Sequence, residues 1–220
     1  MIKMVASDLD GTLLIGGRQT LPEEIFPLVK ELKKMGILFV AASGRQYANM
    51  RNLFAQVKDE MAFISENGGL AVQNEKLLYC DSFDKELVRE SIQAIWEKPG
   101  AEFSCSTKDF YYIMPKTEHY RHLMIEEVKN QCKIIKSFDE ITEPCMKVAV
   151  YEREGMTEES IQYWRERFKD RCTVVTSGFA WVDFVPFTRT KQKGSVNTRN
   201  FWESDRMNAW RSGMNTMILK

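Results

Sequence analysis

The sequence has little histidine, few cysteines and no net charge, and each shortage excludes a class of protein. Its 220 residues carry 31 Lys and Arg against 31 Asp and Glu, whereas a dedicated nucleic-acid-binding domain usually has a basic excess. We therefore expect no nucleic-acid partner. No run of about 18 uncharged apolar residues occurs, so we also expect no membrane span. Asp8 and Asp10 interrupt the N-terminal apolar segment, which argues against a secretory signal.

The cysteines and histidines form no recognisable disulfide or metal pattern. Cysteine occurs five times and never as Cys-x-x-Cys, at positions Cys80, Cys105, Cys132, Cys145 and Cys172. Reduced thiols in a cytoplasmic protein are the simplest interpretation. The two histidines, His119 and His122, have no third histidine or cysteine near them. We interpret both as ordinary surface or core residues.

The first part of the chain alternates between two kinds of apolar pattern. Short apolar runs typical of buried strands occupy residues 2–7, 37–42 and 61–64. Between them, residues 22–35 and 46–57 have the periodicity of helices. Strands that alternate with helices predict βαβ units and a parallel sheet.

After Phe83 the strict alternation stops. Helical patterns and strand-like runs are mixed here; the helical patterns cover 85–97, 118–130 and 158–169, and the strand-like runs cover 102–107, 110–114, 146–152 and 173–176. This mixture predicts an α+β module inserted into an α/β core. The core would comprise residues 1–83 and 178–220, with residues 179–187 returning the chain to it, and the insert would comprise residues 84–177.

The densest chemical signal is the segment DLDGTLL, which follows the first predicted strand. Asp8 and Asp10 place two carboxylates at the carboxyl end of that strand, where open α/β sheets bind ligands, and Gly11 permits a sharp turn. One carboxylate can attack phosphorus while the other transfers protons. Both are hard oxygen donors of the kind that Mg²⁺ prefers. A solvated turn is the alternative, but the preceding strand and the following Thr-Leu-Leu favour function.

A second signal, Ser43-Gly44-Arg45, follows the strand predicted at residues 37–42. A hydroxyl and backbone N–H groups at a helix N-terminus can bind an anion. On its own this segment would be interpreted as an ordinary helix cap. Its position adds weight, because the ends of neighbouring parallel strands open onto one crevice.

Together, DLDGTLL, AASGR, the insert and a lysine-bearing segment resemble the haloacid dehalogenase superfamily over about residues 1–187. Within it, the chain is similar to the Cof-type phosphatases. The resemblance implies a Rossmann-like parallel sheet core with an inserted α+β cap domain. It also implies a Mg²⁺-dependent phosphatase that acts on a small phosphorylated metabolite, such as a sugar phosphate, through an aspartyl-phosphate. A phosphomutase of related architecture is a rival, and no G-x-G-x-x-G follows a strand to support a nucleotide-binding module.

The resemblance further implies roles for individual residues. Asp8 would be the nucleophile and Asp10 the general acid and base, and Mg²⁺ would bind the Asp8 carboxylate and the Asp10 carbonyl. The phosphate would be bound by Gly11, Thr12, Ser43, Gly44 and a fixed cation, either Lys191 or Lys193. The distance along the chain from Pro186 favours Lys191, whereas the doublet Lys193-Gly194 favours Lys193. Arg45 and Asn67 would line the substrate crevice, and the cap would select the substrate.

The sequence departs from the family after Thr188. Such proteins have a fourth motif, Gly-Asp or Gly-Asp-x-x-Asn-Asp, which completes the metal site, and residues 189–220 contain neither it nor an apolar strand run. A shifted reading frame recovers it. The codons of Phe201-Trp202 and Trp202-Glu203 then specify Leu-Gly, and Glu203-Ser204 permits a following Ile. Further on, Met214-Asn215 specifies Glu and Met217-Ile218 specifies Asp, and the neighbouring codons permit the rest of GDEYND.

We therefore hypothesise that residues from about 189 to 220 are a frameshifted, non-native translation; a divergent short relative is the alternative. On the frameshift hypothesis, the first strand becomes a sheet edge with unpaired backbone groups, and Mg²⁺ affinity, activity and stability are impaired. An inactive remnant or a phospho-ligand-binding protein thus stays open beside the phosphatase. The sequence gives no indication of oligomeric state.

Overall fold

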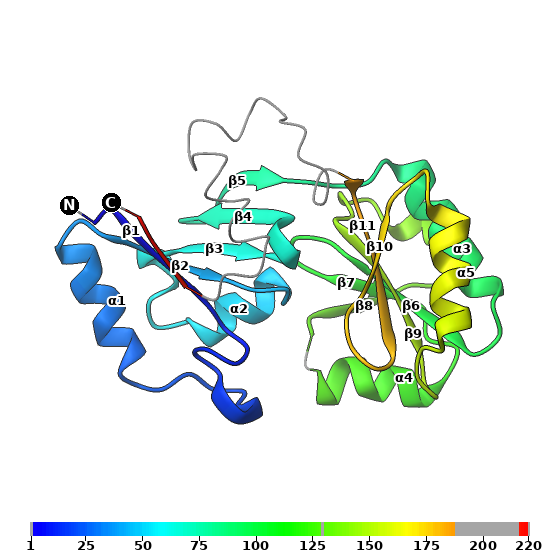
Figure 1. Cartoon of the computed structure of the whole chain (residues 1–220), viewed down its shortest axis with the longest axis horizontal. Coiled ribbons are helices and arrows are strands. Elements are labelled where there is room, and N and C mark those ends of the chain that lie inside the picture. Colours follow the sequence, from blue (N-terminus) through cyan, green and yellow to red (C-terminus); the bar gives the residue numbers. More distant parts are fainter. Residues whose placement is uncertain (1, 129, 188–215, 220) are drawn as a thin grey trace. The chain divides into compact units, whose positions relative to one another are not determined.

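The computed structural model describes residues 2–128, 130–187 and 216–219. The chain forms two units, one containing residues up to Cys80 together with a C-terminal strand, and the other beginning at Asp81. Each unit is built on its own six-stranded sheet (Figure 1). Among the described helices, none combines the length and apolar character needed to cross a bilayer.

The sheet of the first unit has a parallel centre. Strands β1 (Met4–Asp8), β2 (Leu38–Ala42) and β3 (Ala62–Ser65) run parallel, as the alternating pattern predicts. Three antiparallel strands extend it, β4 (Leu70–Gln73), β5 (Lys76–Cys80) and β12 (Thr216–Leu219). The strand order is β12-β1-β2-β3-β4-β5.

Apolar side chains on both faces of the central strands explain their uninterrupted apolar sequence. Alternate residues of a strand point to opposite faces. One face carries a buried cluster of Met4, Ala6, Val40, Ala42, Ala62 and Ile64. On the other face, Phe39 and Phe63 lie against Tyr47 and Phe54 at the two ends of helix α2 (Tyr47–Leu53). Helix α1 (Ile25–Lys34) contacts β2, and the short 3-10 segments are Ile15–Gly17, Lys58–Glu60 and Glu66–Gly68.

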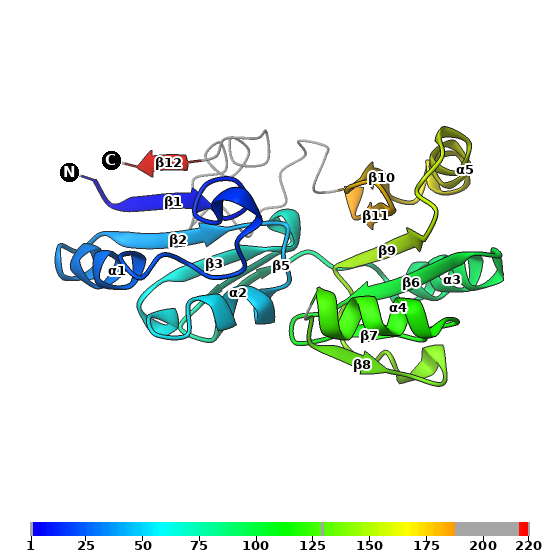
Figure 2. The same cartoon turned by 90° about the horizontal axis from the view of Figure 1, so that it is seen from below.

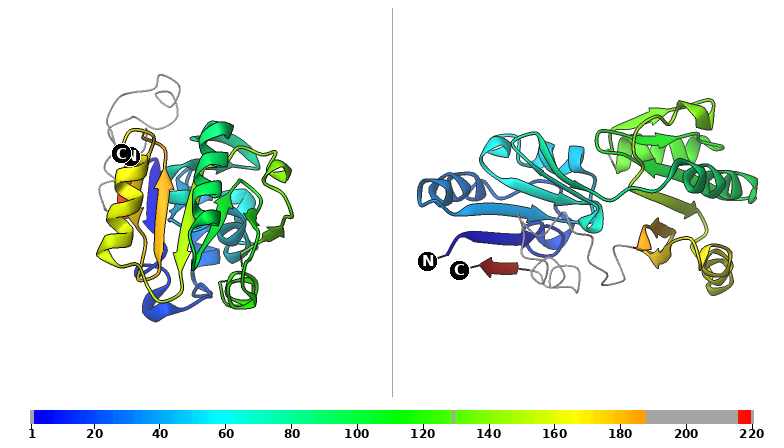
Figure 3. Two further views of the ribbon diagram at one scale, coloured as in Figure 1. Left: turned by 90° about the vertical axis from the view of Figure 1, so that its right-hand side faces the viewer. Right: turned by 90° about the horizontal axis from the view of Figure 1, so that it is seen from above.

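The second unit has a sheet of order β10-β11-β9-β6-β7-β8. Its elements along the chain are α3 (Lys85–Glu97), β6 (Ala101–Ser106), β7 (Tyr111–Ile113), α4 (Glu118–His122), a π-helical turn (Leu123–Glu127), β8 (Cys132–Ile134), a 3-10 turn (Phe138–Glu140), β9 (Lys147–Glu152), α5 (Glu158–Phe168), β10 (Thr173–Thr176) and β11 (Trp181–Val185). Helices α3 and α5 cover one face, where both join a single buried core (Figure 3). On the opposite face, Tyr120 of α4 stacks on Tyr151 of β9.

The prediction that residues 179–187 return the chain to the first unit is wrong. Strand β11 lies between β10 and β9 in the sheet of the second unit, which begins at Asp81 rather than at residue 84. The reason is packing on both faces. Phe184 contacts Trp164 and Phe168 of α5, while Asp183 forms a buried ion pair with Lys147 of β9, with 3.5 Å between the charged atoms.

The prediction that the first strand becomes an edge of its sheet is wrong. Strand β12 pairs antiparallel with β1, so β1 is not an edge of the sheet (Figure 2). The sequence of β12, Thr-Met-Ile-Leu, is a short apolar run of the kind that forms strands, which the prediction for residues 189–220 overlooked. Residues 188–215 lie outside the described residues, and with them most of the segment that we interpret as frameshifted.

Candidate active site

The candidate site lies at the carboxyl ends of the parallel strands of the first unit. Asp8, the last residue of β1, is in register with Ala42, the last residue of β2. Ser43 follows directly, and its N–H donates to the carbonyl of Ile64 in β3 at 2.9 Å. The backbone pairing of three strands thus places the first two sequence motifs side by side.

A tight loop after β1 presents Asp10. Leu9 and Leu14 are buried and anchor the loop, and the Leu14 N–H donates to the Leu9 carbonyl at 2.7 Å. The Gly11 N–H donates to Leu14 and the Thr12 N–H to Leu9, at 3.1 and 3.2 Å. Gly11 has a φ of 83°, which glycine adopts most readily. In this loop Gly11 therefore shapes the turn, because its N–H is already used, and Thr12 retains its hydroxyl for a ligand.

Asp8 carries a destabilised negative charge. Burial at the strand end raises the pKa of its carboxyl, and the nearby charge of Asp10 raises it further, while a hydrogen bond from the Leu9 backbone opposes both effects. A cation at this position would relieve that repulsion. The site therefore favours a positively charged partner next to Asp8.

Arg45 holds the carboxylate of Asp10. Its Nη2 lies 2.7 Å from Oδ1, and its Nε lies 3.2 Å from Oδ1 and 3.0 Å from Oδ2. Ser43 Oγ donates to Asp10 Oδ2 at 3.4 Å and accepts a hydrogen bond from the Arg45 N–H at 3.2 Å. Asp10, Ser43 and Arg45 consequently form one connected polar cluster.

The guanidinium of Arg45 has two further contacts that the sequence did not predict. Its Nη1 donates to Asn49 Oδ1 at 3.3 Å and to Gln19 Oε1 at 3.4 Å. Asn49 lies in the first turn of α2, four residues after Arg45, which itself precedes the helix. Gln19 follows the β1 loop, and no local pattern links it to Arg45.

Asn67 closes the same cluster from the turn after β3. It has a φ of 55°, and its N–H donates to the Ser43 carbonyl at 3.4 Å. A Cβ placed on Gly44 would lie 2.5 Å from Asn67 Oδ1, closer than side chains tolerate. Glycine at position 44 therefore allows the Asn67 amide to approach the loop after β2.

Most of the predicted site residues lie in or beside this cluster, from Asp8 and Asp10 to Ser43, Gly44, Arg45 and Asn67. Lys191 and Lys193, the predicted fixed cations, lie outside the described residues. Among the described residues, no group of three or more His, Cys, Asp or Glu side chains could hold a metal. Asp8 and the Asp10 carbonyl nevertheless fit Mg²⁺, which commonly takes one or two protein carboxylates and completes its shell with water and phosphate. The raised pKa of Asp8 agrees with this fit, since a cation would offset it.

Comparison with known proteins identifies the family. The model of the haloacid dehalogenase-like hydrolases matches residues 5–210. The chain belongs to this family. It is 24% identical over 204 residues to the 5-amino-6-(5-phospho-D-ribitylamino)uracil phosphatase YbjI of Escherichia coli, covering 93% of this chain and 75% of that protein.

Solved structures share the fold. A protein from Eubacterium rectale superposes with a TM-score of 0.75 at 22% identity, over 84% of this chain and 71% of that one. A sugar phosphatase of subclass IIB of the superfamily superposes with a TM-score of 0.64 at 19% identity, over 84% of this chain and 70% of that one. The predicted α/β fold class and the assignment to haloacid dehalogenase-like hydrolases are therefore confirmed.

Proposed function

We propose that the chain is a Mg²⁺-dependent phosphatase that hydrolyses a small phosphorylated metabolite through a phosphate ester of Asp8. The observation that carries the proposal is the convergence of Asp8, Asp10, Ser43 and Arg45 at the carboxyl ends of β1 and β2. Phosphoryl transfer requires positioned groups and stabilised charge more than elaborate chemistry. The names of the relatives, a phosphoribitylaminouracil phosphatase and a sugar phosphatase, support a phosphorylated small molecule as substrate.

The first half-reaction would transfer the phosphoryl group to the protein. An oxygen of the Asp8 carboxylate attacks phosphorus, and the bond from phosphorus to the ester oxygen breaks. Asp10 donates a proton to the departing alkoxide, which leaves as the alcohol. The Ser43 and Thr12 hydroxyls donate hydrogen bonds to the phosphoryl oxygens. Mg²⁺ bound by Asp8 and the Asp10 carbonyl would supply neutralising charge for those oxygens.

The second half-reaction would restore the protein. Asp10, now ionised, takes a proton from water as the water oxygen attacks phosphorus, and the bond between phosphorus and Asp8 breaks to release inorganic phosphate. Arg45 would bind the Asp10 carboxylate in the free protein and the phosphate group when substrate is present. A bound phosphate dianion would compete with the Asp10 carboxylate for the Arg45 guanidinium.

Hydrolysis of para-nitrophenyl phosphate in Mg²⁺ buffer tests the proposal. Asp8→Asn should abolish turnover, and Asp10→Asn should lower it by a factor of about 10²–10⁴, the usual contribution of general acid–base catalysis. Asp59→Asn is the matched control, because Asp59 is an exposed carboxylate of the same unit outside the site, and it should leave the rate unchanged. Full activity in Asp8→Asn would refute the nucleophile assignment.

Covalent trapping tests the intermediate directly. Acid quenching during turnover, followed by borohydride reduction, converts an aspartyl-phosphate to homoserine, which mass spectrometry would locate at position 8. Unmodified Asp8 in an actively turning-over sample would contradict the covalent route.

A phospho-ligand-binding protein without turnover is the second candidate, favoured by the missing fourth motif after Thr188. On that account, inorganic phosphate would bind, Arg45→Met would weaken the binding, and no para-nitrophenol would form. We expect weak Mg²⁺ affinity and a reduced rate if the tail is frameshifted. The nucleotide sequence across codon 189 decides this, since a shift of one or two bases must restore an open frame encoding GDxxND.

A further inference from the structure

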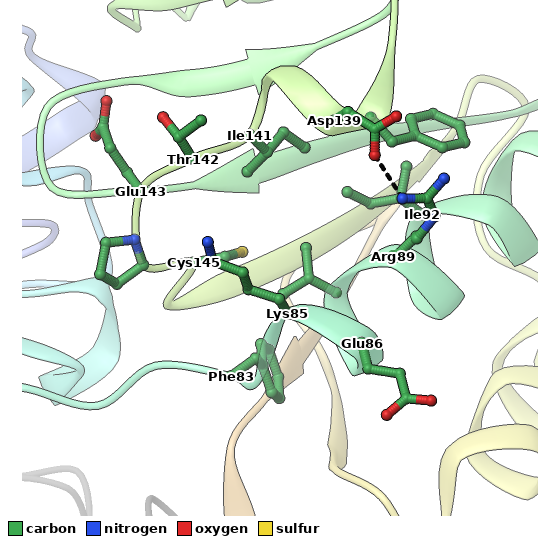
Figure 4. Close-up of a pocket in the computed structure, with 13 residues that line it drawn as sticks. Phe83, Lys85, Glu86, Arg89, Ile92, Asp139, Ile141, Thr142, Glu143 and Cys145 are labelled. Carbon is green, nitrogen blue, oxygen red and sulfur yellow. Dashed lines mark hydrogen bonds and ion pairs between the residues drawn. The ribbon is translucent and has the colours of Figure 1, made fainter.

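A cavity of about 410 Å³ opens in the second unit beside the first turns of α3 (Figure 4). Its walls are α3 and the segment of residues 138–145 that leads to β9, and none of its residues belongs to the candidate active site. Ligand pockets for small molecules typically measure about 300–1,000 Å³. The cavity is thus large enough for a ligand of one or two rings.

The wall of the cavity is apolar and already packed. Val88 and Ile92, one turn apart on α3, are buried members of the core of this unit. Phe138 and Ile141 on the opposite wall pack against the same core. The Phe83 N–H donates to the Cys145 carbonyl at 2.9 Å and ties the two walls together. An apolar ligand would therefore meet a preformed surface.

Two acidic residues at the cavity are committed to other groups. The carboxylate oxygens of Glu143 accept hydrogen bonds from Thr107 Oγ1 at 2.9 Å and from the Tyr112 hydroxyl at 2.8 Å. Asp139 pairs with Arg89 across the mouth, with 2.5 Å between Oδ1 and Nη1. That pair contributes little stability and can exchange partners, because both side chains are about two-thirds exposed, at 68% and 66%.

Lys85 is an unpaired cation at the rim of the cavity. Within the part of the chain that the structure describes, its ammonium group has no hydrogen bond or ion pair. Glu86 is also unpaired there, but its side chain extends in the opposite direction from that of Lys85 (Figure 4). Lys85 and Arg89 lie one helical turn apart and share a face of α3. The rim therefore offers an unpaired ammonium and a guanidinium held only by an exposed carboxylate.

We propose that this cavity binds a small organic anion with a hydrophobic body, an aromatic or branched carboxylate. The apolar part would lie against the partly buried side chains of Phe83, Phe138 and Ile141, above the buried Val88 and Ile92. The carboxylate would bind the Lys85 ammonium and compete with Asp139 for Arg89. The cavity is a second ligand site of the protein, and its existence does not depend on the proposed phosphatase mechanism.

Calorimetry with a matched pair of probes tests the charge and the apolar body separately. Naphthalene-2-acetate carries both features, whereas naphthalene-2-acetamide has nearly the same shape without the charge. We expect the acid to bind the full chain with a sub-millimolar Kd. Lys85→Met should weaken the acid about tenfold, the worth of one charge-assisted hydrogen bond, and leave the amide unchanged.

Lys169→Met is the control variant, because it removes an exposed lysine charge of the same unit that lies outside the cavity, at the C-terminal end of α5. It should leave the binding of both probes unchanged. Backbone amide shifts in the NMR spectrum of the unmodified chain give a readout independent of any variant, and the acid should move those of Val88, Ile141 and Thr142. Equal affinity for acid and amide, unchanged binding in Lys85→Met, shifts confined to other residues, or no binding at about 5 mM acid would each overturn the proposal.

Discussion

The contact between Arg45 and Asp10 gives the sharpest quantitative prediction. Two unit charges 4 Å apart attract by about 1 kcal/mol in bulk water and by about 4 kcal/mol near a protein surface. The Asp10 side chain is 54% exposed, which favours the lower value, whereas Arg45 is 21% exposed and contacts both carboxylate oxygens. Exposed pairs typically contribute about 0.2–1 kcal/mol. We therefore expect a coupling energy of about 1 kcal/mol.

A double-mutant cycle measures that coupling. Arg45→Met, Asp10→Asn and the double variant would be compared by native-state hydrogen exchange at the amides of Val40 and Ala41 in β2, which report the opening of the first unit. The method suits this unit because three of the five tryptophans, Trp96, Trp164 and Trp181, lie in the second unit, so tryptophan fluorescence would not report on the first sheet alone. The coupling energy should fall as the salt concentration rises to 1 M, where the Debye length is only about 3 Å.

The exposed pair of Lys34 and Glu31 provides the control cycle. Its atoms are 2.6 Å apart, but both side chains are more than 60% exposed, at 71% and 62%. Such a pair on a helix should couple by no more than about 0.5 kcal/mol. If the Arg45–Asp10 coupling does not exceed this control, or does not change with salt, the interpretation of Arg45 as the residue that fixes Asp10 is refuted.

Three further outcomes follow from particular contacts. Gly44→Ala should displace the Asn67 amide by at least about 0.5 Å, because the new Cβ would lie 2.5 Å from its Oδ1; the result should be a raised KM in the phosphatase assay with little loss of stability by circular dichroism. Trp164→Ala, at a fully buried core position, should destabilise the second unit by about 3–5 kcal/mol in urea unfolding followed at the NMR amide signals of Val148 and Val150 in β9. Burial raises the pKa of the Cys172 thiol to about 12, so iodoacetamide at pH 8 should alkylate it at least tenfold more slowly in the folded chain than in urea, and equal rates would contradict its burial.

Local patterns predicted the parts of the fold that local physics determines. The helix at residues 85–97 and the strand at 173–176 agree with α3 and β10 residue for residue. Asp84 caps α3 by accepting the Leu87 N–H at 2.8 Å, a signal that can be read directly from sequence. Strands β4, β5, β8 and β12 were not predicted. β5 and β8 lack a buried apolar run, and β8 has only three residues.

In the candidate site too, some contacts could be predicted from local sequence patterns and others could not. Asp8 and Ser43 could be placed together because parallel strands bring their carboxyl ends to one edge. The pairing of Asp10 with Arg45 joins residues 35 positions apart, and no periodicity encodes it. The position of β11 likewise depended on tertiary packing, since an apolar run with one acidic residue suits either sheet until Lys147 is known to form an ion pair with Asp183.

The tail and the candidate site depend on different interactions of β1. One edge of β1 pairs with β2, and this pairing alone fixes the register of Asp8 with Ala42 and hence the approach of Asp10 to Ser43. The other edge pairs with β12 through backbone groups, which are the same whatever side chains the tail carries. A change of reading frame after residue 188 would therefore leave the convergence of Asp8, Ser43 and Arg45 intact. It would act on whatever the tail contributes through side chains, which are the carboxylates expected for a metal and the phosphate-binding cation expected at Lys191 or Lys193. A shortfall in activity should therefore be found in Mg²⁺ affinity and in the contribution of that lysine to phosphate binding, and not in the position of Asp8, Ser43 and Arg45.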